Sequence, residues 1–273
     1  MATHNQVREI GYLLKDPKIL NEGIEGAEKV LFQIRTIHRE TEGYYGRSFE
    51  DIVIYYDGNE NSLMGKVKAL HQFDLVDIKG VFNILTVNKR SICPYCGTQN
   101  IKYRGCSTFI YPISMSKIGS FLTEYDKDER MPDEILERNF KENSNQALII
   151  GTVVSDPENV IVKGRQYCRY RLGVDRKYYI KTQDEITADY PWVYSCGQQA
   201  EWDIVHLVKG AVVLVDGFIR QRQVEATIVC EGCNTEYTYP DTMTEFVPYS
   251  LEYLSGHKTD EDIAMEAELA RRG

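Results

Sequence analysis

Short apolar runs, separated by turn residues, dominate the hydrophobic pattern of the chain. Many alternate with polar residues, and a period of two residues is typical of β-strands. In the second half of the chain these runs cover residues 147–154, 167–174, 192–196 and 211–219. The segment 198–209 differs, because its apolar residues recur at helical spacing. The pattern predicts a strand-rich fold with a helix between the third and fourth strands.

The same pattern occurs twice along the chain. Three groups of residues recur 140 positions later: Asn5-Gln6, Gly11 and Asp16-Pro17 return as Asn145-Gln146, Gly151 and Asp156-Pro157. The motif Cys93-Pro-Tyr-Cys96 returns 137 positions later as Cys230-Glu-Gly-Cys233. Between these anchors, residues 32–38 track 168–174, and residues 78–82 track 215–219. Collinear matches with small changes of offset indicate a duplicated unit with different loop lengths.

Each unit has the element order of a five-stranded OB barrel, which is three strands, a helix, a strand and a long final hairpin. We therefore predict a mainly all-β protein of two tandem five-stranded OB-fold barrels, each with a short helix. The expected boundaries are a first barrel at 1–121, an acidic linker at 122–144, a second barrel at 145–255 and an acidic, helical tail at 256–273. Within the linker, residues 132–140 are expected to form a short helix.

The second unit resembles the bacterial single-stranded DNA-binding protein family. The residues that carry the resemblance are Asn145, Ile150-Gly151, Asp156-Pro157, Arg171 to Val174, Trp192, Gly197, Ala200-Glu201, Lys209-Gly210, Val215 to Gly217 and Arg220 to Arg222. The resemblance implies base stacking on Trp192 and a role for Arg220 and Arg222 in binding the strand. In the first unit Asn83 and Leu85 replace these two arginines. We therefore expect that unit to be a diverged copy with weaker recognition.

The composition of the second unit supports the same function by physical argument. Between Lys163 and Lys181 there are seven basic residues and one acidic residue, interleaved with tyrosines. A single strand offers base faces for stacking and phosphates for cations. Because side chains alternate along a strand, Arg169 and Arg171 are expected to point outward together. The predicted DNA-binding residues are Arg169, Arg171, Arg176, Lys177, Tyr178, Tyr179, Tyr190, Trp192, Tyr194, Arg220 and Arg222. Two alternatives stay open, Trp192 inside the barrel core and the last two arginines on a solvated edge.

The two Cys-x-x-Cys motifs have the spacing of zinc knuckles, and a structural zinc site takes four ligands. In one solution Cys93, Cys96, Cys230 and Cys233 bind one structural Zn²⁺ and join the two barrels. In the other, the first unit uses Cys93, Cys96 and Cys106 with a fourth group. We favour the shared site, because the second unit has no obvious further ligands near Cys233. A pair that binds no metal is the remaining alternative.

Net charge and the missing motifs restrict the function further. A net charge of −9 argues mildly against nucleic acid, but much of the acid lies in the linker and the tail. The chain has no apolar run of the roughly 20 residues that a membrane span needs, and residues 1–6 lack the pattern of a signal peptide. We therefore expect a cytoplasmic protein. No nucleotide-binding loop, metalloprotease helix or nucleophile elbow occurs, which predicts a protein that is not an enzyme.

The sequence thus predicts a protein that coats single-stranded DNA in replication or recombination, and its unusual layout suggests a mobile element. The expected partners are single-stranded DNA and replication or recombination proteins. The resemblance also implies a homodimer that displays four OB-folds. The alternatives are a protein-interaction scaffold of a replication or transcription complex, which the acidic charge favours, and an RNA-binding OB-fold protein.

Overall fold

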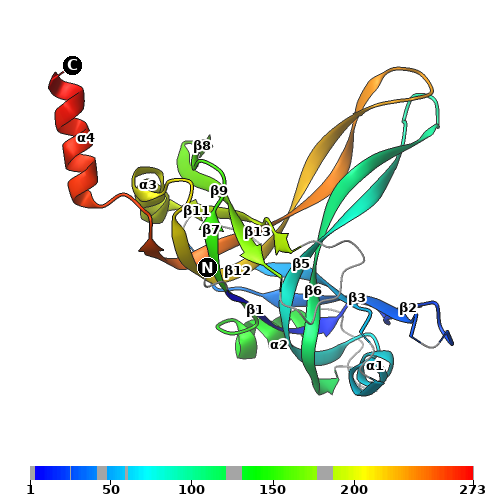
Figure 1. Ribbon diagram of the computed structural model, residues 1–273. Coiled ribbons are helices and arrows are strands. Elements are labelled where there is room, and N and C mark those ends of the chain that lie inside the picture. Colours follow the sequence, from blue (N-terminus) through cyan, green and yellow to red (C-terminus); the bar gives the residue numbers. More distant parts are fainter. Residues whose placement is uncertain are drawn as a thin grey trace.

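The computed structural model describes residues 4–24, 26–41, 48–58, 61–120, 131–176 and 187–272. Within these ranges the chain forms two β-barrels that share one continuous sheet, with short helices at their edges (Figure 1). None of the described helices is long and apolar enough to cross a membrane.

Residues 4–120 form the first barrel. Its elements are β1 (His4–Leu13), β2 (Lys18–Leu20), β3 (Lys29–Ile37), β4 (Phe49–Tyr56), α1 (Asn61–Lys68), β5 (Asp74–Ile92) and β6 (Gln99–Ser120). The barrel closes because β1 pairs with β3 and β5, β3 pairs with β4, and β6 pairs with both β4 and β5. Helix α1 contributes Leu63 and Val67 to the core.

Residues 145–255 repeat this arrangement. Their elements are β7 (Asn145–Val153), β8 (Glu158–Val162), β9 (Arg165–Asp175), β10 (Ala188–Asp189), β11 (Trp192–Cys196), α3 (Gly197–His206), β12 (Val212–Val229) and β13 (Glu236–Ser255). Here β7, β9, β11, β13 and β12 close the barrel, while β8 and β10 pair with β9 at its edge. The prediction of two five-stranded barrels with a helix between the third and fourth strands is confirmed.

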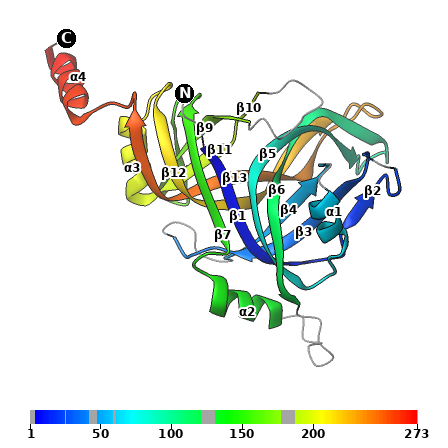
Figure 2. The same cartoon turned by 60° about the horizontal axis from the view of Figure 1, so that its bottom comes forward.

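The two barrels join through β1 and β7, which lie side by side and run antiparallel (Figure 2). The pairing is centred on Val7 opposite Ala147, which are equivalent positions of the repeat. The junction therefore has an approximate twofold symmetry. It also makes a single hydrophobic core, in which Phe82 of the first unit and Phe246 of the second have ring centroids 4.9 Å apart.

A pair of equivalent asparagines attaches each of the two junction strands to a neighbouring strand of its own barrel. Asn5 donates to the carbonyl of Phe82 at 2.9 Å and accepts its N–H at 3.0 Å. Asn145 makes the same two bonds with Ile219, at 2.8 and 2.9 Å. All four residues are buried, so these bonds satisfy backbone groups that water does not reach. The repeated Asn that marks the duplication in the sequence is a structural residue in both units.

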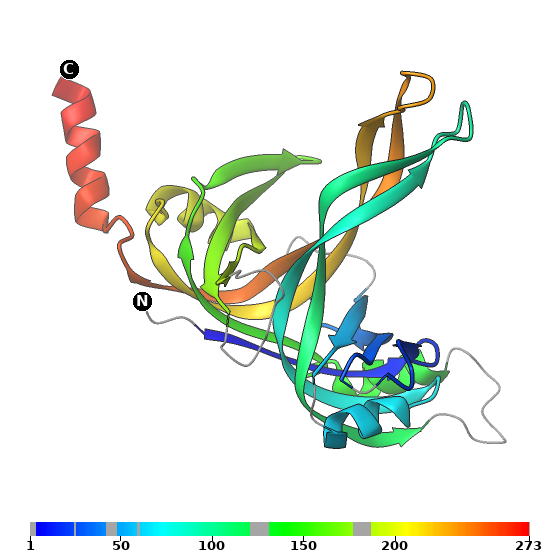
Figure 3. The same ribbon diagram turned by 45° about the vertical axis from the view of Figure 1, so that its right-hand side comes forward.

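The final hairpin of each barrel extends well beyond it, and the two hairpins lie side by side as far as their tips (Figure 3). We call residues 84–108 the first arm and residues 221–244 the second arm. Tyr237 of the second arm connects them through its hydroxyl, which lies 2.7 Å from Ser91 Oγ and accepts from Asn100 Nδ2 at 3.0 Å. The arms therefore form one projecting element of two paired hairpins.

Two helices follow the barrels. Helix α2 (Met131–Phe140) contacts β1 and β3 of the first barrel and buries Leu136 completely. Helix α4 (Asp260–Arg272) projects away from the second barrel and buries none of its residues (Figure 1). Helix α2 lies in the segment predicted as the linker and α4 in the segment predicted as the tail.

Candidate nucleic-acid interface

The outer surface of the second barrel is built on β9 and β11, which pair antiparallel. Along β9, Tyr170, Leu172 and Val174 are buried in the core, whereas Arg169 and Arg171 point outward. This agrees with the alternation expected of a strand. We call the outward side chains of these two strands the aromatic face; they are Tyr167, Arg169, Arg171, Trp192 and Tyr194.

Trp192 is the centre of the aromatic face. It lies opposite Arg171 in the strand pairing, and it is partly exposed rather than part of the core. The guanidinium carbons of Arg169 and Arg171 lie 4.6 and 4.5 Å from the centroid of its ring. Such cation–π contacts orient the indole and keep two guanidinium groups beside it, of which Arg169 is also ion-paired with Glu158. The alternative in which Trp192 fills the barrel core is therefore wrong.

Tyr194 lies deeper in the same face, with 7% of its surface exposed. Its ring is 5.1 Å from that of Tyr167, and Arg222 approaches to 6.0 Å from its centroid. Arg222 also forms an ion pair with the buried Glu245 at 2.9 Å. Burial, and then the charge of Glu245, raise the pKa of Tyr194. Tyr194 is thus a largely buried part of the aromatic face, and Arg222 lies at the edge of this face.

Tyr190 is the most exposed of the predicted stacking residues that the structure describes, at 52%. It precedes β11, and its ring lies close to Gly173 of β9. Three further predicted residues, Lys177, Tyr178 and Tyr179, lie outside the described part of the chain.

Arg176 has a different position from the one predicted. Its side chain is only 3% exposed and forms a buried ion pair with Asp189 at 2.7 Å. Arg176 donates to the carbonyl oxygen of Ile84, and Asp189 accepts the Ile84 N–H at 2.9 Å. The pair thereby attaches the second barrel to the base of the first arm. We accordingly leave Arg176 out of the proposed DNA-binding surface.

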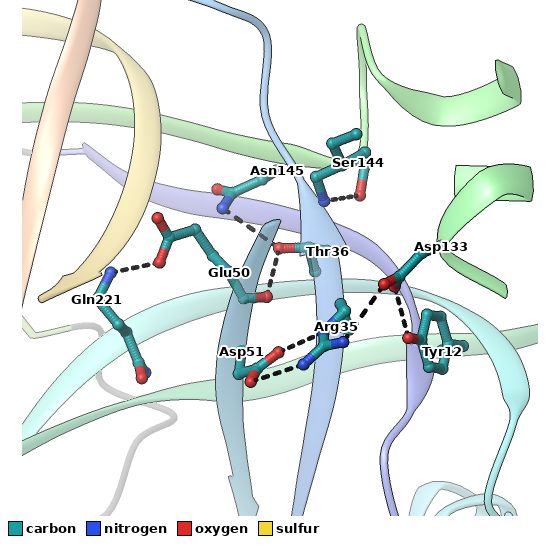
Figure 4. Close-up of polar contacts among 10 residues, drawn as sticks. Tyr12, Arg35, Thr36, Glu50, Asp51, Asp133, Ser144, Asn145 and Gln221 are labelled. Atoms are coloured by element: carbon teal, nitrogen blue, oxygen red, sulfur yellow. Dashed lines mark hydrogen bonds and ion pairs between the residues drawn. The ribbon is translucent and has the colours of Figure 1, made fainter. Parts of the chain in front are cut away.

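Arg220 lies toward the seam between the barrels. The carboxylate of Glu50 accepts the N–H of Gln221 at 2.7 Å (Figure 4). Burial raises the pKa of Glu50 to about 7, although the Gln221 bond and the charge of Arg220 oppose the shift. His38 stacks on Phe218 at 3.9 Å between ring centroids, and burial, aided by Arg220, lowers its pKa. The charge of Arg220 therefore lowers the pKa of both Glu50 and His38, which lie where the two barrels meet.

Sequence reasoning missed the acidic part of the seam. Glu9 of β1 is fully buried, and neither carboxylate oxygen has a hydrogen-bond partner among the described residues. Burial and the nearby Glu50 raise its pKa well above the ordinary value, which favours the neutral acid. The repeat could have revealed Glu9, because the equivalent residue of the second unit is Ile149. An acid where the other copy has an apolar residue points to a special environment.

The tips of the two arms bring together Cys93, Cys96, Cys230 and Cys233. Their sulfur atoms all lie within 4.8 Å of one another. Across the arms, Cys93 and Cys233 are 3.8 Å apart and Cys96 and Cys230 are 3.4 Å apart. Thiolates that bind one tetrahedral zinc ion at its usual distance lie about 3.8 Å from each other. Cys106 lies lower on β6, opposite Thr86, and is outside this cluster.

Hydrogen bonds favour the thiolate form of Cys230, whereas burial raises the pKa of Cys93 to about 11. Burial raises the pKa of the Cys230 thiol, but bonds from the backbone of Cys233, the amide of Asn100 and the backbone of Gly232 lower it to about 6. The amide nitrogen of Gly232 lies 3.3 Å from the sulfur, and that of Asn100 lies 3.5 Å from it. Such donors are typical of the outer shell of cysteine metal sites. The donor set therefore suits a soft metal ion.

Two closed barrels joined edge to edge, with an aromatic and cationic face on the second, define a tandem OB-fold protein. Residues 144–236 match the single-strand binding protein family. This range contains the whole aromatic face and the cysteines of the second arm. The match therefore falls on the second barrel, the unit whose sequence resembles that family.

Relatives and solved structures agree with this assignment. The chain is 32% identical over 84 residues to single-stranded DNA-binding protein 2 of Clostridium acetobutylicum, and 32% identical over 83 residues to the single-stranded DNA-binding protein of Thermotoga maritima. These matches cover 30% of this chain and 62% and 59% of the relatives, about three fifths of their length.

The likeness to a solved structure extends over almost the whole chain. The single-stranded DNA-binding protein of Thermus aquaticus superposes with a TM-score of 0.61 at 15% identity, covering 95% of this chain and 97% of that one. A deletion mutant of the same protein gives a TM-score of 0.60 over 95% and 98%. At this identity the likeness shows the fold, and it includes both barrels.

Proposed function

We propose that this protein binds single-stranded DNA on the aromatic face of its second barrel, and that it is a binding protein rather than an enzyme. The observation that carries the proposal is the position of Trp192, outside the core and under the guanidinium groups of Arg169 and Arg171. A flat ring next to fixed cations is the combination that a sequence-tolerant binder of single strands needs. The names of the two relatives support DNA as the ligand.

In this proposal a base stacks on Trp192 and displaces one of the guanidinium groups that rest on it. The displaced arginine then binds the adjacent phosphate, so the cation–π contact of the free protein is exchanged for an ion pair. Tyr190, which is half exposed, provides a second ring before β11. Arg222 extends the cationic track toward the second arm. Each stacked base contributes roughly 1–3 kcal/mol.

The acidic net charge is compatible with this function because it is unevenly distributed. The helix α4, which projects away from the barrel, has three acidic residues in its first turn: Asp260, Glu261 and Asp262. The aromatic face instead has exposed or partly exposed arginines. Local charge decides the contacts with phosphates, since salt screens charges beyond about 10 Å at moderate ionic strength.

We also propose that the four clustered cysteines bind one structural zinc ion that joins the two arms. The support is the spacing of the sulfur atoms and the bonds that favour the thiolate of Cys230. A zinc ion there would hold the arms in a fixed relation to each other. The metal has a structural role in this proposal, because all four positions of a tetrahedral site are taken by protein ligands.

The cellular role that we propose is the coating of strands exposed in replication or recombination, in the cytoplasm and in the context of a mobile element. Two chains would form a homodimer with four OB-folds, and replication or recombination proteins would be its partners. The basis is the family of the second barrel.

Reversing the charge of Arg169 and Arg171 to glutamate tests the proposed function against the scaffold alternative. We expect oligo-dT binding to fall at least tenfold, because repulsion replaces two phosphate contacts. Affinity of the parent chain should also fall as salt rises. The measurement is fluorescence anisotropy of a labelled oligonucleotide at several salt concentrations.

The matched control reverses Arg271 and Arg272, which change the net charge equally but lie on the projecting helix α4. Equal affinity of the two variants would mean that the face is not the binding surface. Competition with an oligo-rU of the same length tests the RNA-binding alternative. That alternative requires oligo-rU to displace the bound oligo-dT.

A further inference from the structure

The first barrel has a surface equivalent to the aromatic face, and its residues are different. In the second barrel Arg171 of β9 lies opposite Trp192 of β11. In the first barrel the matching strands are β3 and β4, where Arg35 lies opposite Asp51. The repeat aligns Arg35 with Arg171, so an aspartate takes the position of the central tryptophan. The first barrel thus has an acid where the second has its stacking ring.

The equivalent arginine is also fully engaged by carboxylates. Arg35 Nε donates to Asp51 Oδ1 at 2.8 Å and Nη2 donates to Asp51 Oδ2 at 3.2 Å. Its Nη1 lies 3.5 Å from Asp133 of the linker helix α2 (Figure 4). The Arg35 side chain is 19% exposed, whereas Arg171 is exposed. A phosphate would have to displace two carboxylates to reach it.

Helix α2 is held over this region by its own contacts. Tyr12 of β1 donates its hydroxyl to the other oxygen of Asp133 at 2.6 Å. Leu136, completely buried, packs in a cluster with Ile10 and Ile37. Among the residues that the structure describes, no helix covers the second barrel in this way, and the helix that follows it, α4, buries none of its residues. The position equivalent to Ile37 is Gly173, beside the half-exposed Tyr190.

We infer that the first barrel does not bind a strand, and that each chain offers a single strand-binding surface, on the second barrel. Helix α2 and the carboxylates of Asp51 and Asp133 occupy the first barrel's equivalent surface. The first barrel then acts as a scaffold that carries the first arm and pairs with β7. This inference rests on the proposed function of the second barrel.

The test is the number of short strands that one chain binds. An oligo-dT of about ten nucleotides is long enough for one OB-fold, whose site takes roughly 4–16 nucleotides. Native mass spectrometry of the full chain with excess oligonucleotide should show one strand per chain. The Trp192→Ala variant should show a much smaller bound fraction under the same conditions.

Photocrosslinking identifies the barrel that holds the strand. With a 5-iodo-deoxyuridine oligonucleotide, crosslinked peptides are expected from residues 145–255 and not from 1–120. Two strands per chain, or one strand retained by Trp192→Ala and crosslinked to the first barrel, would overturn the inference while the proposed function stands. If no strand binds the parent chain at all, the proposed function fails and the inference fails with it.

Discussion

Replacing Trp192 by alanine is expected to weaken oligo-dT binding about 10- to 100-fold, since stacking of one base contributes roughly 1–3 kcal/mol. Both arginines of the aromatic face rest on this indole, so its removal also releases their side chains from a fixed position. The barrel itself should remain folded, because Trp192 lies outside the hydrophobic core. The dissociation constant is measured at one fixed salt concentration, and folding is checked by circular dichroism.

Trp202→Ala provides the matched control. Trp202 lies on α3 of the same barrel and is 51% exposed, but it is not part of the aromatic face. Its removal should leave the affinity for oligo-dT within about twofold of the parent, because isolated exposed side chains contribute little outside an interface. If both variants lost affinity equally, or if Trp192→Ala bound as well as the parent, the aromatic face would not be the site.

The second large effect is expected at the arm tips. Replacing Cys230 by serine should lower the zinc content from about one ion per chain to none, because the site would then have three thiolates instead of four. Cys230 is completely buried, and hydrogen bonds lower the pKa of its thiol to about 6 against the effect of burial. Without the metal, proteases should cut the arms faster while the barrels stay intact. Elemental analysis and limited proteolysis measure the two effects.

Cys106→Ser is the control for this prediction. Cys106 is exposed on β6 and lies outside the cluster, so this variant should keep its zinc. Loss of the metal from Cys106→Ser would favour the alternative site within the first unit. Two ions per chain in the parent would contradict the shared site, and a parent purified without any metal would contradict zinc as its ion.

The sequence was sufficient for the features that depend on local pattern and on the repeat. Alternation placed Arg169 and Arg171 on the outside of β9, and the structure confirms that side. The two Cys-x-x-Cys motifs predicted that four cysteines share one site, and the structure brings these four together at the arm tips. These predictions succeeded because strand parity and duplication are properties of the chain itself.

Long-range contacts decided the features that the sequence did not reveal. Arg176 lies in a basic stretch, but Asp189 and the backbone of Ile84, 92 residues away, remove it from solvent. The cover over the equivalent surface of the first barrel likewise includes Asp133, which contacts Arg35 across 98 positions. No local pattern shows which partner a charged side chain finds after folding. The repeat alone could not show that the first barrel has lost its stacking residue. Asp51 can be aligned with Trp192 only when the strand pairing is known.

The central claim, that Trp192 stacks on a DNA base, is tested most directly with a chain that has a single tryptophan. The Trp202→Phe variant keeps Trp192 as its one indole, since the chain contains two tryptophans. Titration with oligo-dT should quench its fluorescence to saturation, and added salt should restore it. Fluorescence that stays constant while anisotropy shows the oligonucleotide bound would contradict stacking on Trp192, and with it the surface proposed for binding.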